Sequence, residues 1–123
     1  MGLLSDVGKR MINRLQYDLM LRNSIKPQVV IAEDASTVAD IIEMAAAAVG
    51  GKEKLQHRPL FALYCEPTSP LQLPFESVDK LLLAAQCRVP VNFACGAVAG
   101  ASTPVTVAGT VAQANAEALC GLV

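Results

Sequence analysis

The segment LFALYCEPTSP, residues 60–70, decides the fold that the sequence predicts. Its first six residues are apolar on both faces of an extended chain, which is typical of a parallel strand that helices cover on each side. Glu66 follows at the carboxyl end of this strand, and Pro67 and Pro70 fix φ in the loop after it. The segment therefore predicts a buried strand that carries a carboxylate to the end of a parallel sheet.

Two further β-branched apolar runs, residues 28–32 and 89–94, resemble this strand, and the three runs begin 32 and 29 residues apart. Such spacing suits successive βα units. Helical periodicity between the runs predicts four helices, over residues 3–23, from Asp34 or Ser36 to 49, over 75–86, and from Thr103 to about 119. Residues 52–59 read as a charged linker.

Local signals set the expected helix ends and faces. Asp34 or Ser36 can accept a hydrogen bond from a free backbone N–H at a helix start, and Gly50 can end that helix in a left-handed conformation. Thr103 is expected to cap the last helix, with Pro104 at its first position. Three apolar stripes are expected to mark helix faces: 4, 7, 11, 15 and 19 in the first helix; 38, 41, 42, 45 and 49 in the second; and 78, 81, 82 and 85, turned inward, in the third. The last helix is built almost entirely of small residues, so we expect it to lie very close to a neighbour.

The element order predicts an α/β fold of consecutive βα units with a parallel sheet. We expect residues 1–123 to form a single partial domain, with an N-terminal helix over 1–23 and three βα units over 27–122. A small three-layer sandwich and part of a (β/α)8 TIM barrel both fit, and a whole barrel needs about 250 residues. The barrel explains better why three strands leave two apolar edges open.

Composition excludes several classes of function. Ten basic residues face eleven acidic ones, no Lys/Arg cluster occurs, and Trp is absent, so nucleic-acid binding is not expected. The uncharged stretch 89–116 is long enough to span a bilayer but contains two prolines, three glycines and several polar residues, so no membrane span is expected. No export signal is recognised at the start of the sequence, and the cytoplasm is the expected location.

The four cysteines, Cys65, Cys87, Cys95 and Cys120, show no Cys-x-x-Cys spacing and are expected to be buried thiols. Cys65 and Cys95 both lie at strand ends, but the single histidine, His57, lies in the polar linker. No metal site is therefore expected.

The small-residue run AGASTPVTVAGT, residues 99–110, followed by NAE at 115–117, resembles the trimethylamine:corrinoid methyltransferase family, which includes members that act on glycine betaine. The resemblance extends back through CEPTSPL at 65–71, to GG at 50–51, EMAA at 43–46 and KP at 26–27. Members of that family are much longer (β/α)8 barrels. This sequence looks like an internal part of one.

The resemblance implies a portion of an enzyme that moves a methyl group from a methylated amine, of the trimethylamine or glycine betaine type, to a corrinoid protein. The corrinoid (cobalamin) is then carried by that partner, and this chain binds no cofactor itself. In the methylamine-specific branch the reaction centre holds pyrrolysine well downstream of the small-residue run. The isolated chain is therefore expected to be incomplete and inactive.

Five residues are candidates for substrate binding. Glu66 could attract a quaternary ammonium, and strand alternation places Tyr64 on the same face. Gly100, Ser102 and Thr103 lie in a small-residue loop that could approach a carboxylate or phosphate closely, aided by the free N–H groups of the next helix. The alternative interpretation is a solvated loop residue or a cap for the next helix at Glu66, and simple close packing in the small-residue loop.

Two other functions stay open on the residues alone. One is a non-catalytic α/β binding or scaffold module that self-associates through its open edges into a homo-oligomer. The other is an anion-binding enzyme, which is disfavoured because neither the P-loop motif nor Gly-x-Gly-x-x-Gly occurs.

Overall fold

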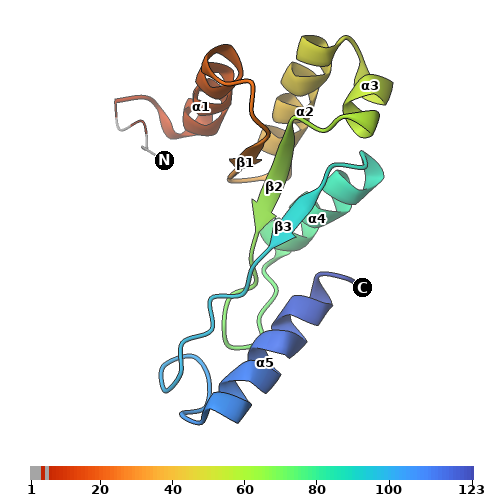
Figure 1. The fold of residues 1–123 in the computed structure, drawn as a ribbon. Helices are drawn as coiled ribbons and strands as arrows, with labels where there is room; N and C mark the ends of the chain where they lie inside the picture. Colours follow the sequence, from red (N-terminus) through yellow and green to blue (C-terminus); the bar gives the residue numbers. More distant parts are fainter. Residues whose placement is uncertain (1–3, 5) are drawn as a thin grey trace.

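The chain folds into five helices and a small parallel sheet, in a computed structural model that describes residue 4 and residues 6–123 (Figure 1). In chain order the elements are α1 (Lys9–Asn23), β1 (Gln28–Val30), α2 (Ala35–Val49), α3 (Lys52–His57), β2 (Phe61–Cys65), α4 (Phe75–Gln86), β3 (Val91–Phe93) and α5 (Val107–Cys120). The predicted α/β class is confirmed. The expected linker at 52–59 is wrong, because most of it forms α3.

The sheet has the order β1-β2-β3, and both pairings are parallel. Gln28 pairs with Phe61 and Leu63 pairs with Val91, so β2 is the central strand. In the described part of the chain the outer edges of β1 and β3 pair with no further strand. The parallel βα arrangement is therefore observed, whereas a closed barrel is not shown.

Helices cover one face of this sheet. Phe61, Leu63 and Cys65 alternate along β2 and are buried in one cluster with Ile41 of α2. On the other face, Tyr64 is half-buried, and Val29 of β1 is 47% exposed. The expectation that both faces are covered is therefore wrong for the described residues, and the open face is free to line a site.

The second helix is capped as its sequence predicts. The Asp34 carboxylate accepts a hydrogen bond from the Thr37 N–H at 2.7 Å, and Gly50 ends α2 with a φ of 86°. The first helix begins later than predicted, at Lys9, since Gly8 occupies the N-cap position with extended backbone. The predicted helical residues 1–3 and 5 lie outside the described residues.

Two helix faces differ from their predicted orientation. In α1 the stripe containing Met11 and Leu19 is 48% exposed at both residues, and Tyr17 is buried instead, with its ring 5.3 Å from Phe61 in an edge-on contact. The predicted inward stripe of α4 is wrong at Leu82, which is 57% exposed, whereas Leu81 packs against the core cluster as predicted. The buried residues of α4 are the smaller Ser77 and Ala84.

The last helix lies beyond the carboxyl ends of the strands, away from α1 and α2 (Figure 1). It begins at Val107, and its N-cap is Thr106, which accepts from the Gly109 N–H at 3.2 Å. The predicted cap at Thr103 is therefore wrong. Thr103 lies in the preceding loop, where its hydroxyl donates to the Thr110 hydroxyl at 3.1 Å.

Three of the six alanine and glycine residues of α5, Ala108, Ala112 and Ala116, are exposed, so the expected close packing occurs only locally. Gly121, just after the helix, is the tightest approach, since a Cβ there would lie 2.5 Å from the Phe93 ring. Among the described residues, no helix is both long and apolar enough to cross a membrane.

Candidate site at the carboxyl ends of the strands

Tyr64 and Glu66 form the polar centre of the open sheet face. They are two residues apart on an extended chain, so both side chains point to the same side. The Tyr64 hydroxyl donates to Glu66 Oε2 at 2.9 Å. This hydrogen bond, followed by partial desolvation, raises the pKa of Tyr64. The predicted shared face is confirmed, and the phenol orients the carboxylate.

A cavity of about 500 Å³ lies beside this pair, where two loops meet at the carboxyl ends of β2 and β3. One wall is the segment 66–69 after β2, and the other comes from the small-residue loop after β3. The lining residues are Glu66, Pro67, Thr68, Ser69, Gly96, Val98, Ala101 and Ser102. The cavity thus joins one carboxylate to hydroxyl groups and small side chains that leave room for a ligand.

The small-residue loop has a defined shape. Gly100 has a φ of 78°, a left-handed conformation that suits glycine, and its N–H donates to the Thr103 carbonyl at 2.9 Å. The Ser102 hydroxyl accepts from the Val98 N–H at 3.0 Å. These bonds fold residues 98–103 into a compact turn, with Thr103 buried behind it.

The five predicted binding residues therefore take different positions. Glu66 and Ser102 both line the cavity, and Tyr64, outside the lining, donates a hydrogen bond to Glu66. Gly100 and Thr103 lie outside the lining and shape the loop that contributes Ser102. Two of the five predicted residues thus line the cavity and a third orients one of them, and substrate binding by any of them stays a prediction.

Glu117 of α5 is a polar residue of this region that the sequence reasoning missed. It is 1% exposed, because the loop after β2 lies over it. It accepts from the Ser69 hydroxyl at 2.6 Å, from the Leu71 N–H at 3.0 Å and from the Gln113 side chain at 3.1 Å. The Leu71 N–H, then Ser69 and Gln113, lower the pKa of Glu117.

One sequence signal could have drawn attention to Glu117: it is the only charged residue after Arg88. It also follows Gln113 by four positions, which places both side chains on one face of a helix. A single carboxylate in a segment of small residues, with an amide on the same face, suggests a specific polar contact.

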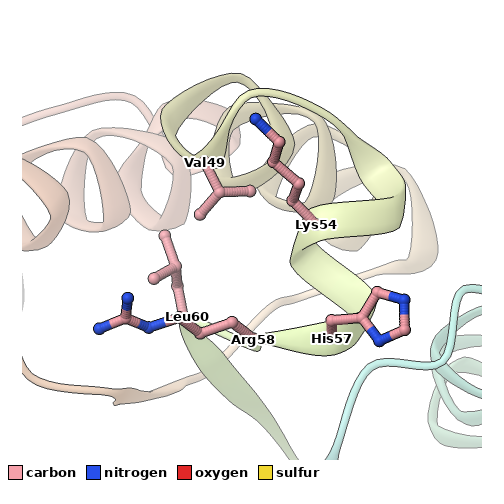
Figure 2. A pocket seen from close by; sticks show the side chains of 5 residues that line it. All are labelled: Val49, Lys54, His57, Arg58 and Leu60. Atoms are coloured by element: carbon pink, nitrogen blue, oxygen red, sulfur yellow. The ribbon is translucent and has the colours of Figure 1, made fainter.

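A second cavity, of about 450 Å³, lies at the opposite end of β2, beside α3 (Figure 2). Val49, Lys54, His57, Arg58 and Leu60 line it. The Lys54 amino group lies beside Gly50, where its charge favours the C-terminal end of α2, and the His57 ring points away from Val49 and Leu60. None of the predicted binding residues lines this cavity, so the carboxyl-end site remains the candidate.

The described residues contain no group of three or more His, Cys, Asp or Glu side chains that could hold a metal ion. Cys65 is buried behind the sheet, and burial raises the pKa of its thiol. The Cys95 thiol donates to the Ala114 carbonyl at 3.4 Å. Cys65 is thus part of the buried core, and Cys95 connects the loop after β3 to α5.

Comparison with known proteins identifies the family. The family profile described as Trimethylamine methyltransferase (MTTB) matches residues 6–123. Trimethylamine methyltransferase MttB of Desulfitobacterium hafniense (strain DSM 10664 / DCB-2) is 33% identical over 106 residues, which are 86% of this chain and 21% of that protein. MttB of Methanosarcina thermophila is 38% identical over 74 residues, 60% of this chain and 15% of that protein.

A relative with a different substrate in its name also matches. Glycine betaine methyltransferase of Desulfitobacterium hafniense (strain Y51) is 29% identical over 102 residues, 83% of this chain and 21% of that protein. The chain thus spans about a fifth of the length of the longest-matched relatives. With its family profile matched over nearly the whole chain, this protein belongs to the trimethylamine methyltransferase family.

Proposed function

We propose that this chain forms part of a cytoplasmic methyltransferase that moves a methyl group from a methylated amine to a corrinoid protein. In this proposal the carboxyl-end cavity contributes to amine binding. The observation that supports it most directly is the Tyr64–Glu66 pair, which places a carboxylate and a phenol on an uncovered sheet face beside that cavity. The family membership supplies the reaction class.

Glu66 is the group that would attract the substrate. A methylated ammonium has a permanent or protonated positive charge and few hydrogen-bond donors, so a carboxylate and an aromatic face are suitable partners. Tyr64 supplies the aromatic ring and also holds the carboxylate at 2.9 Å. An oriented carboxylate restricts where the cation sits, and restricting the reactant is how such a site would aid methyl transfer.

The open sheet face agrees with a place in a (β/α)8 barrel, where one face lines the interior and the other meets the helices. We propose that the exposed side of β1–β3 faces such an interior in the whole protein. This would place Glu66 at the carboxyl-end mouth, where barrel enzymes bind their substrates.

The residues around the cavity fit an amine better than a corrin. The Glu66 carboxylate in its lining suits a cationic amine, and none of the described lining residues is a histidine or cysteine that could ligate cobalt. A corrinoid would supply the methyl-accepting metal when its carrier protein docks. This chain's own residues would bind and orient the amine.

Two substrate types are compatible with the cavity. Trimethylamine would need only the carboxylate and apolar walls. Glycine betaine adds a carboxylate of its own, for which the small residues Gly96 and Ala101 leave room beside the Ser102 hydroxyl. We propose that this site binds both trimethylamine and glycine betaine, and each can be tested separately.

The test is a titration of the ¹⁵N-labelled chain with glycine betaine and, separately, with trimethylammonium. We expect shifts at Glu66, Ser69 and Ser102, and binding about fivefold weaker in Glu66→Gln, the effect of removing one partly solvated charge. Glu53→Gln, the same change on exposed α3, is the matched control. Saturable shifts confined to the second cavity would contradict the proposed site.

The catalytic test uses the same chain with a corrinoid acceptor. We expect no methyl transfer by the isolated 123 residues, because positioning needs groups from several more strands. Measured transfer to cob(I)alamin by the pure chain would overturn this expectation.

We further propose that the chain self-associates when it is alone. Val29, Ile31 and Leu82 are each about half exposed, at 47%, 48% and 57%, and the outer edges of β1 and β3 are unpaired in the described part of the chain. Exposed apolar side chains and free strand edges favour pairing with a second copy. Light scattering at micromolar concentration should give a mass above that of one chain, and a monomer would contradict the proposal.

A further inference from the structure

The two loops that wall the carboxyl-end cavity are each folded on themselves. In the loop after β2, the Thr68 and Gln72 backbones exchange hydrogen bonds of 2.8 and 2.9 Å. In the loop after β3, Gly100 and Thr103 close a separate turn. These internal bonds fix the shape of each loop. They do not connect the two loops, so another contact must set the distance between the two walls of the cavity.

Glu117 of α5 accepts hydrogen bonds from the first wall, the loop after β2. One carboxylate oxygen accepts from the Ser69 hydroxyl at 2.6 Å, and the other accepts from the Leu71 N–H at 3.0 Å. Both donors belong to the loop after β2, 46 to 48 residues earlier in the chain. Ser69 also lines the cavity, so the carboxylate acts directly on a wall residue.

Gln113 carries the same network to the second wall. Its side-chain NH₂ group donates to Glu117 Oε1 at 3.1 Å and to the Ser102 carbonyl oxygen at 2.8 Å. Ser102 lines the cavity opposite Ser69. A continuous chain of hydrogen bonds therefore runs from Ser69 through Glu117 and Gln113 to Ser102.

The backbone at Leu71 gives independent support. Leu71 has a φ of 51°, a left-handed conformation that non-glycine residues seldom adopt, and its side chain is 66% exposed. Side-chain burial therefore gives little compensation for this conformation. The hydrogen bond from the Leu71 N–H to Glu117 compensates for this conformation instead. Residues in such sparsely populated conformations persist where the surrounding structure holds them.

We propose that Glu117 and Gln113 are positioning residues that hold Ser69 and Ser102, on opposite walls, in the arrangement that binds the methylated amine. The inference rests on the proposed function for the claim that the cavity binds an amine. The connection between the two walls rests on the hydrogen bonds. Neither side chain lines the cavity, so both act through the residues that do.

The test compares Glu117→Gln, Gln113→Leu and the control Glu53→Gln in the full 123-residue chain. Amide hydrogen exchange is measured at Leu71 in the first wall and at Gly100 and Ser102 in the second. Amides of β2 show whether each variant is folded. Glycine betaine is then titrated into each protein.

Glu117→Gln should speed exchange about tenfold in both walls, because the neutral amide cannot accept from all three donors. Gln113→Leu should speed exchange in the second wall and leave Leu71 protected, since Ser69 and Leu71 keep their acceptor. Each variant should weaken betaine binding about threefold, less than the loss expected for Glu66→Gln, while the β2 amides stay unchanged. This pattern distinguishes positioning from general loss of structure.

Unchanged exchange at Gly100 and Ser102 in both variants would overturn the link between the walls. Equal betaine affinity in wild type and Glu117→Gln would overturn the positioning role and leave the proposed function standing. If wild type binds neither betaine nor trimethylammonium while the exchange pattern holds, the proposed function fails and the link is supported.

Discussion

Apolar packing holds one half of this molecule, and hydrogen bonds hold the other. Around α1, α2 and β2, the side chains of Tyr17, Ile41 and Leu63 are fully buried in one cluster. At the carboxyl ends of the strands, the only buried residue of α5 is Glu117, a carboxylate. The two halves thus differ in the main interaction that orders them, although α5 also packs closely against Phe93 at Gly121.

This difference suits a scaffold that carries a site. Burial of large apolar side chains contributes the larger free energies, about 1.5–3 kcal/mol for a whole side chain. A hydrogen bond contributes a net free energy of only about 0.5–1.5 kcal/mol but requires specific geometry. We therefore expect mutations in the packed half to alter global stability, and mutations near α5 to alter local order.

Leu63→Ala should have the largest effect. Leu63 is fully buried in the central strand, and its truncation should lower the free energy of unfolding by about 2–5 kcal/mol. Urea unfolding followed by circular dichroism measures the change. Leu82→Ala, at a position 57% exposed, should change it by less than about 1 kcal/mol. Equal losses in the two variants would show that the cluster does not dominate stability.

Gly121→Ala tests where α5 meets the sheet. A Cβ at Gly121 would lie 2.5 Å from Phe93 Cδ1, so either the ring or the helix end must move. Such overpacking costs about 1–3 kcal/mol, and we expect it as faster amide exchange in α5 with β2 unchanged. Gly8→Ala is the control, since nothing lies within 4 Å of its added Cβ. Unaltered exchange in α5 would mean that this contact does not anchor the helix.

Asp34→Ala should lower stability by about 0.5–2 kcal/mol, because it removes the cap of α2. Its hydrogen bonds with the Thr37 N–H, and then Ser36, lower the pKa of Asp34 to about 2 from an ordinary 3.8. A lowered pKa means that the carboxylate contributes fully above pH 3.8 and loses that contribution as pH falls toward 2. Urea unfolding at pH 7 and pH 2 should therefore differ less for Asp34→Asn than for wild type. An equal change in unfolding free energy between pH 7 and pH 2 in both proteins would contradict a stabilising role for the Asp34 carboxylate.

Features that depend on a few neighbouring residues could be predicted from the sequence. The three strands, the Asp34 cap and the Gly50 helix end all follow from local composition and backbone preference. Tyr64 and Glu66 share a face because alternation along an extended chain requires it. The α/β class follows from the order of these elements.

Features set by distant parts of the chain could not be predicted in this way. Periodicity shows that α1 and α4 have apolar stripes, but Tyr17 and Ala84 face the core because the sheet lies on their side. Glu117 meets a loop 46 to 48 residues away, and no local rule pairs them. Thr103, expected as a helix cap, instead contacts Thr110, and the helix begins at Val107 with Thr106 as its cap.

Acidification should have the smallest effect on global stability and a local effect at α5. Hydrogen bonds from Leu71, Ser69 and Gln113 lower the pKa of Glu117 from its ordinary 4.5. A group with a lowered pKa contributes fully above the ordinary value and loses its contribution as pH falls through the lower one. The Leu71 amide should therefore shift and lose exchange protection only below pH 4.5, while Leu63 in β2 stays protected.

An NMR pH titration of wild type and Glu117→Gln measures this difference. The variant should show no corresponding transition at Leu71, because its amide does not titrate. A wild-type transition above pH 4.5 would contradict the carboxylate's stabilisation by the loop. Simultaneous loss of protection at Leu63 would show instead that the two halves unfold as one unit, and the division between packed scaffold and hydrogen-bonded site would fail.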